Sequence, residues 1–122
     1  MTLNHLIFLL TLLQVGSLSA QNDFIESNDL LPSDHTYFGG LGGGISAIDF
    51  DNDGLDDLTI ASGSGSNIGF YRNTGAGFIK VDTGILNFDE TNQLLWADYD
   101  NDGDQDLYVC AFEGINRLYK NN

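Results

Sequence analysis

Residues 49–58 read DFDNDGLDDL, and this stretch places five carboxylates within ten residues. It returns 49 positions later as DYDNDGDQDL, residues 98–107, with seven of the ten positions identical. In each copy a short apolar run precedes the acidic segment and another follows it, which is the pattern of a loop between two strands. The repeat therefore predicts a chain built from copies of one strand–acidic loop–strand unit.

Further short apolar runs, separated by turn residues, extend this unit. No segment keeps a 3.6-residue apolar period over the length of a helix. A repeat of this length with four short strands is typical of a β-propeller blade, and propellers have about four to eight blades. We therefore expect an all-β fold of about two four-stranded antiparallel blades, which form an incomplete β-propeller. The expected strands are ISAIDF, DLTIAS, IGFYRN and FIKVD in the first copy, and LLWADY, DLYVCAF and NRLYKN in the second.

The beginning of the chain has the pattern of a secretory signal. The apolar run LIFLLTLLQVGSL starts at Leu6, and small residues close it up to Ala20, as in a signal peptide helix followed by its cleavage site. The run is shorter than the ~20 residues that a membrane span needs. We therefore expect a secreted protein, extracellular or at the cell surface, with no membrane span in the mature chain. The expected segments are a signal peptide at 1–20, a lead-in at 21–37, a first blade at 38–82, a connector at 83–93 and a truncated second blade at 94–122.

The charge of the chain is strongly acidic and unevenly placed. There are 18 acidic residues against four basic ones, a formal net charge of −14. This charge argues against a nucleic-acid partner, which Lys and Arg would have to bind at the phosphates. Hydrophobic residues make up 42% of the chain, too many for a disordered acidic segment. Ten of the 18 acids lie in the two acidic stretches, and this concentration indicates a site.

Both acidic stretches have the donor pattern of a calcium loop. Carboxylates occupy positions 1, 3, 5 and 9, a glycine at position 6 can take a positive φ, and position 7 can offer its backbone carbonyl. Calcium (Ca2+) takes six to eight such oxygens, whereas zinc prefers His or Cys. Without a cation the like charges would repel one another. We therefore expect two calcium sites, with Asp49, Asp51, Asp53, Leu55 and Asp57 as ligands in the first and Asp98, Asp100, Asp102, Asp104 and Asp106 in the second.

Three other interpretations of the acidic stretches fit the sequence less well. An exposed acidic turn accounts for one copy, because Asp, Asn and Gly favour turns, but it does not explain two copies in one frame. An EF-hand needs a bidentate Glu at position 12, where this chain has Ile60 and Val109. A phosphotransferase of the haloacid dehalogenase type also has D-x-D after an apolar strand. That fold needs a parallel sheet with helical crossovers, and no such helices are indicated.

The strands carry side chains that we expect between the blades. Cys110 is the only cysteine, which excludes an intrachain disulfide, and its apolar surroundings predict a buried small residue. Several large side chains in the expected strands are more typical of a core between blades than of a sugar-stacking platform. They are Phe70, Tyr71, Trp96, Leu118 and Tyr119.

The segments GGGISAIDFDNDGLDDLTIASG and WADYDNDGDQDLYVCAF, with NRLYKNN at the end, resemble FG-GAP/VCBS repeats. These repeats form the propeller of integrin α-subunits and of many secreted bacterial proteins. The resemblance covers residues 37–122 and is nearest to the cartilage acidic protein or ASPIC/UnbV-type secreted family. It implies calcium in the loop between the first two strands of each blade and seven blades in the full protein. Because the sequence stops inside the second blade, we expect an N-terminal fragment.

The function expected from these features is that of a secreted calcium-binding β-propeller repeat module for binding or adhesion, in which calcium is structural. No catalytic constellation is identifiable, so we do not expect an enzyme. The alternative is a non-catalytic part of a larger secreted propeller enzyme that acts on polysaccharide or similar substrates. The expected partner is an unknown protein or carbohydrate ligand. Self-association through open blade edges is a further expectation.

Overall fold

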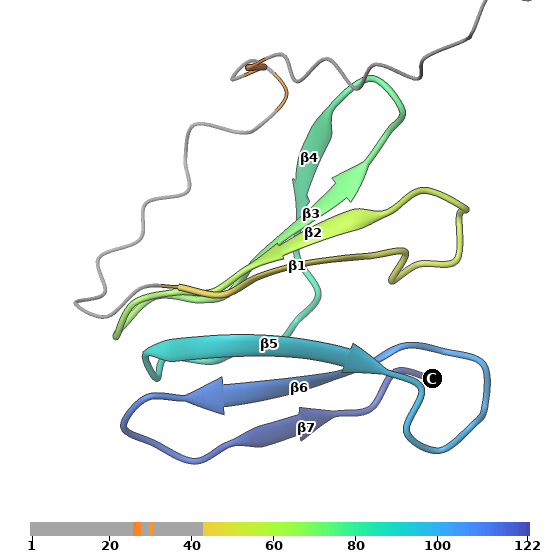
Figure 1. Ribbon diagram of the computed structural model, residues 1–122. Helices are drawn as coiled ribbons and strands as arrows, with labels where there is room; N and C mark the ends of the chain where they lie inside the picture. Colours follow the sequence, from red (N-terminus) through yellow and green to blue (C-terminus); the bar gives the residue numbers. More distant parts are fainter. Residues whose placement is uncertain (1–25, 28–29, 31–42) are drawn as a thin grey trace, which may run out of the picture.

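The computed structural model describes residues 26–27, 30 and 43–122. The expected signal peptide helix at 1–20 and all but three residues of the lead-in at 21–37 lie outside the described residues. The described part of the chain is all-β, with no α-helix, and forms two antiparallel sheets (Figure 1). No helix within it is long and apolar enough to cross a membrane.

Each sheet is a meander in which strands that follow one another in sequence pair. The first sheet has the order β1-β2-β3-β4 and the second has the order β5-β6-β7. The predicted fold of about two antiparallel blades, incomplete as a propeller, is therefore confirmed, with three strands in the second sheet. The strands are β1 (Ile45–Ile48), β2 (Asp57–Ile60), β3 (Gly69–Asn73), β4 (Phe78–Val81), β5 (Thr91–Ala97), β6 (Asp106–Ala111) and β7 (Arg117–Tyr119).

Strand β5 begins earlier than the sequence indicated. It starts at Thr91, inside the segment 83–93 that was expected as a connector. The Thr91 side chain is fully buried, and its backbone N–H donates to the carbonyl of Ser62 at 2.9 Å. This bond ties the beginning of the second sheet to the residues that follow β2, so the extra strand length belongs to the contact between the sheets.

Aromatic side chains fill the contact between the two sheets. The rings of Phe50 and Trp96 stack with their centroids 5.7 Å apart, and Phe70 meets both rings edge-on. The indole Nε1 of Trp96 donates to Oγ1 of Thr59 at 3.2 Å. A Cβ at Gly44 would lie 3.0 Å from the Cα of Gln93, so glycine is what permits this approach of the residue before β1 to β5. The predicted inter-blade packing of Phe70 and Trp96 is confirmed.

Two other side chains are less buried than the sequence suggested. Leu118 is 49% exposed, because it pairs with Tyr108 and Leu95 in one row across the second sheet and this row faces outward. Its neighbour Tyr119 points the opposite way and packs against the core, as strand alternation requires. Cys110 on β6 is half-buried and forms no disulfide, so the expectation of a buried cysteine is corrected.

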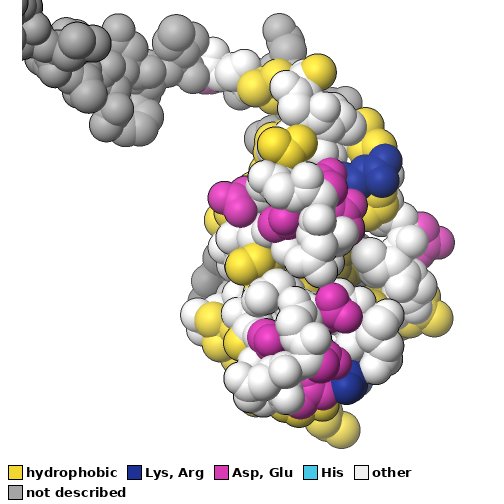
Figure 2. Space-filling model, turned by 90° about the vertical axis from the view of Figure 1, so that its right-hand side faces the viewer, with side chains coloured by type: hydrophobic (Ala, Val, Ile, Leu, Met, Phe, Trp, Pro, Cys, Tyr) yellow, Lys and Arg dark blue, Asp and Glu magenta, His cyan; other side chains and the backbone are white. Residues whose placement is uncertain are grey.

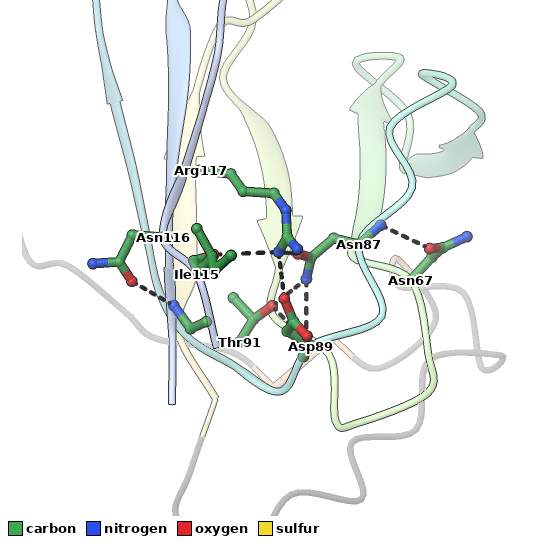
Figure 3. A network of polar contacts seen from close by, with 8 residues as sticks. Asn67, Asn87, Asp89, Thr91, Ile115, Asn116 and Arg117 are labelled. Atoms are coloured by element: carbon green, nitrogen blue, oxygen red, sulfur yellow. Dashed lines mark hydrogen bonds and ion pairs between the residues drawn. The ribbon is translucent and has the colours of Figure 1, made fainter. Parts of the chain in front are cut away.

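A polar network joins the segment between the sheets to β7 (Figure 3). Nη1 of Arg117 donates to Oδ1 of Asn87 at 2.9 Å and forms an ion pair with Asp89. Asn87 is 1% exposed, and its Nδ2 donates to Oγ1 of Thr91 at 3.0 Å. The backbone N–H of Asn87 donates to Oδ1 of Asn67 at 3.2 Å. The segment that leads from β4 to β5 is therefore bonded to the connection between β2 and β3 on one side and to β5 and β7 on the other, which links the two sheets.

Two candidate metal centres in repeated acidic loops

The two acidic stretches form loops at the same end of the molecule, one between β1 and β2 and one between β5 and β6 (Figure 1). Figure 2 views this end, where acidic side chains gather in two groups, one above the other. The loops touch, because Nδ2 of Asn52 in the first donates to Oδ1 of Asp104 in the second at 3.1 Å. Packing of β1 beside β5 brings the loops together, since each loop directly follows one of these strands.

The first loop is held by hydrogen bonds from its own backbone. Asp49 accepts the N–H of Asp53 at 3.0 Å on Oδ1 and the N–H of Gly54 at 2.7 Å on Oδ2. Oδ1 of Asp53 accepts the N–H of Leu55 at 2.9 Å. Asn52 has φ 61° and Gly54 has φ 91°, both left-handed conformations that Asn and Gly tolerate best. These two residues turn the chain back on itself.

The second loop repeats this arrangement bond for bond. Asp98 accepts the N–H groups of Asp102 and Gly103, both at 3.0 Å. Oδ1 of Asp102 accepts the N–H of Asp104 at 3.1 Å. Asn101 has φ 60° and Gly103 has φ 101°. Because two stretches 49 residues apart adopt one geometry, the shared sequence pattern determines the loop conformation.

The last carboxylate of each pattern is the buried first residue of a strand. Asp57 is fully buried and accepts the N–H of Phe50 at 3.2 Å and the N–H of Asn73 at 2.8 Å. Burial is the largest effect on the pKa of Asp57 and raises it above its ordinary value. The two hydrogen bonds lower the pKa, and the negative charges of Asp51 and Asp53 raise it further, so the net shift is upward. The carboxylate therefore joins the ends of β1, β2 and β3 but carries an electrostatic cost when no cation is near.

The second copy has the equivalent buried carboxylate at Asp106, which is 1% exposed. It accepts the N–H of Tyr99 at 3.1 Å and the N–H of Asn121 at 2.9 Å. Asn73 and Asn121 thus have the same role in the two repeats. The sequence interpretation missed both residues, although the alignment of IGFYRN with NRLYKN was the signal that could have found them.

Three carboxylates of each loop converge closely enough to share one metal ion. One oxygen from each of Asp49, Asp51 and Asp57 lies within 4.8 Å of the others. Asp98, Asp100 and Asp106 form the equivalent triad in the second loop. Calcium–oxygen distances are about 2.3–2.6 Å, so two oxygens on opposite sides of one ion are about 5 Å apart. The donor set and its spacing therefore fit calcium, and the described residues bring no His or Cys into either triad.

Six of the ten predicted ligands lie in the two triads. The other four stay predictions, and their contacts in the structure are as follows. Asp53 and Asp102 each accept a backbone N–H two residues ahead, which stabilises the turn. Leu55 is 38% exposed and contributes its N–H to this turn. The side chain of Asp104 accepts the bond from Asn52 and so faces the first loop.

Lys120 is a further residue of the second loop that the sequence interpretation did not include. Its Nζ forms an ion pair with Oδ2 of Asp100 and lies 3.1 Å from Oδ2 of Asp102. The pKa of Asp102 is lowered, first by the hydrogen bond from the N–H of Asp104 and then by the hydrogen bond from Lys120. The pKa of Lys120 is raised by its hydrogen bonds to the same two carboxylates. Sequence spacing gave no signal, because the lysine lies 20 residues from Asp100.

Comparison with known protein families agrees with this geometry. An FG-GAP-like repeat matches residues 49–109, half of the chain. The match begins at the first residue of the first acidic loop and includes the whole second loop. The chain belongs to the FG-GAP-like repeat family. No curated protein and no solved structure gives a significant match.

Proposed function

We propose that this chain is a secreted, calcium-binding propeller repeat module that acts in binding or adhesion, with one structural calcium ion in each acidic loop. The observation that carries the proposal is the pair of carboxylate triads, which have one geometry and are built by one hydrogen-bond pattern. Asp49, Asp51 and Asp57 would hold the ion in the first loop, and Asp98, Asp100 and Asp106 would hold it in the second.

In this proposal calcium supplies the positive charge that each loop lacks. Asp57 and Asp106 connect the loops to the sheets, because each is buried and bonded to backbone groups on two sides. Extracellular calcium modules bind at roughly 10⁻⁴–10⁻³ M. At millimolar calcium the tighter end of that range corresponds to stabilisation on the order of 1–2 kcal/mol per site. The strands are also held by their own pairing and by the aromatic contact between the sheets, so we expect them to persist after chelation.

The finer parts of the proposal concern location and partner. We place the protein outside the cell or at its surface and relate it to the cartilage acidic protein or ASPIC/UnbV-type family, on the resemblance of its repeats. The partner is a protein or carbohydrate ligand, and the proposal assigns the described residues no catalytic role. Self-association is a further proposal, supported by the outward row of Leu95, Tyr108 and Leu118, each at least 37% exposed.

Calcium titration calorimetry on the purified chain tests the proposal. We expect about two ions per chain, one ion fewer for Asp51→Ala, and one fewer for Asp100→Ala. Asp56→Asn is the matched control, because it removes one negative charge from the first loop at an exposed residue outside the triad. The proposal is wrong if the chain binds no calcium at millimolar concentration, or if the control loses an ion as the triad variants do.

A further inference from the structure

The two loops have equal numbers of acids but unequal surroundings. Each ten-residue stretch contains five carboxylates. Lys120 forms an ion pair with Asp100, a triad member, and with Asp102 beside it. In residues 43–122, no ion pair involves a carboxylate of the first triad. The second loop therefore has a side-chain cation in direct contact, and among the described residues the first loop has none.

The position of Lys120 has a counterpart in the first repeat. Arg72 and Lys120 both follow a tyrosine and precede the asparagine whose N–H bonds the buried aspartate. Arg72 is exposed on β3, opposite Ile79 of β4, and makes no ion pair within the described part of the chain. Two aligned basic residues thus have different contacts, and this difference distinguishes two loops that share one backbone geometry.

We infer that Lys120 is a built-in competitor for the metal in the second loop, so that the first loop binds calcium more tightly and fills first. The inference rests on the proposed function. A cation shared by Asp98, Asp100 and Asp106 needs an oxygen of Asp100, and the ammonium group of Lys120 already contacts that carboxylate. Binding at the second loop must therefore weaken or break this ion pair, whereas binding at the first loop breaks none.

The structure also provides space for the displaced lysine. Lys120 lines a cavity of about 390 Å³ between the sheets, together with Phe50, Trp96 and Tyr119. Its methylene groups can pack on these aromatic rings while the charged end stays near solvent. Displacement of the ammonium group therefore needs only a side-chain movement.

The expected difference in calcium affinity between the two loops is modest and depends on salt concentration. The side chain of Lys120 is 39% exposed, so its ion pairs are screened by water and ions. An exposed pair of this kind corresponds to a weakening of calcium binding at the second loop by roughly twofold to fivefold. Because a Debye length is about 10 Å at 0.1 M salt and about 3 Å at 1 M, the difference should shrink as salt increases.

The test measures calcium dissociation constants by calorimetry in chains with one working loop. Asp100→Ala leaves the first loop, and Asp51→Ala leaves the second. We expect the second loop to bind calcium roughly twofold to fivefold more weakly than the first. Adding Lys120→Met to the Asp51→Ala chain should raise the calcium affinity of the second loop to that of the first. Adding Lys120→Arg to the same chain should leave the second loop the weaker one. Arg72→Met in the Asp100→Ala chain is the matched control and should change the first loop less than about twofold.

Each outcome has a separate meaning. Equal dissociation constants for the two loops, or no tightening with Lys120→Met, overturns the inference and leaves the proposed function in place. Absence of calcium binding in both chains overturns both. Lys120→Gln serves as a second neutral variant if the methionine variant does not fold, with circular dichroism as the check. The ratio of the two calcium dissociation constants should decrease as salt rises from about 0.05 M to about 0.5 M. A ratio that does not decrease also contradicts competition by the charge of Lys120.

Discussion

Asp57→Ala tests the structural role of the buried carboxylate that connects the first loop to its sheet. Asp57 is fully buried and accepts two backbone N–H groups, from Phe50 and Asn73. A hydrogen bond to a charged acceptor contributes about 1.5–3 kcal/mol, and an unpaired buried donor costs about 1–3 kcal/mol. The desolvation that raises the pKa of this carboxyl offsets part of the gain. We therefore expect the metal-free variant to lose about 2–3 kcal/mol of unfolding free energy.

The assay is urea unfolding followed by circular dichroism, with a chelator present so that loss of a metal ligand does not contribute. Asp56→Ala is the control, because this neighbouring side chain is exposed, and it should change the unfolding free energy by less than about 0.5 kcal/mol. Asp106→Ala should lose as much as Asp57→Ala, since its two bonds are equivalent. A loss below about 0.5 kcal/mol for Asp57→Ala would refute the reasoning.

Three further predictions concern the sheet contact, the loop backbone and pH. Trp96→Phe should lower the unfolding free energy by about 1–2 kcal/mol, because the buried hydroxyl of Thr59 loses its donor; an unchanged urea midpoint would contradict this. Because Asn101 has φ 60°, Asn101→Ala should lower the unfolding free energy by about 1 kcal/mol, and Asn101→Gly should leave it unchanged. Equal melting temperatures for the alanine and glycine variants would contradict this prediction. Burial raises the folded-state pKa of Asp57, so protonation of this group favours the folded state when no metal is bound. This pH-dependent part of its stability is fully present below the unfolded pKa of about 3.9 and is lost as pH rises through the folded value. Unfolding curves measured with a chelator across this pH range should show the loss for the native chain and not for Asp57→Ala.

The fold and the loop positions could be predicted because local sequence determines them. The shared pattern with Asn at position 4 and Gly at position 6 allows left-handed backbone at those two places in both loops, and short apolar runs on either side pair as hairpins. The role of position 5 could not be predicted from spacing. Oδ1 of Asp53 and of Asp102 each accepts a backbone N–H two residues ahead, and the spacing of carboxylates alone does not show this turn-stabilising bond.

The remaining differences arise from pairing between distant residues. Lys120 reaches Asp100 because β7 pairs with β6, and a linear pattern does not show which basic residue will lie beside which loop. Leu118 is exposed because the register of that pairing places it on the outward face with Tyr108. The early start of β5 depends on the bond between Thr91 and Ser62, 29 residues apart. Such contacts are tertiary, and apolar periodicity carries no information about them.

The most direct test of the central claim is an anomalous-scattering map from crystals of the full chain grown in millimolar calcium. We predict two ions per chain, one bonded to Asp49, Asp51 and Asp57 and one to Asp98, Asp100 and Asp106, at about 2.3–2.6 Å from the carboxylate oxygens. Well-ordered loops with no ion at either triad, or ions bound only elsewhere, would contradict the claim that these repeats are calcium sites.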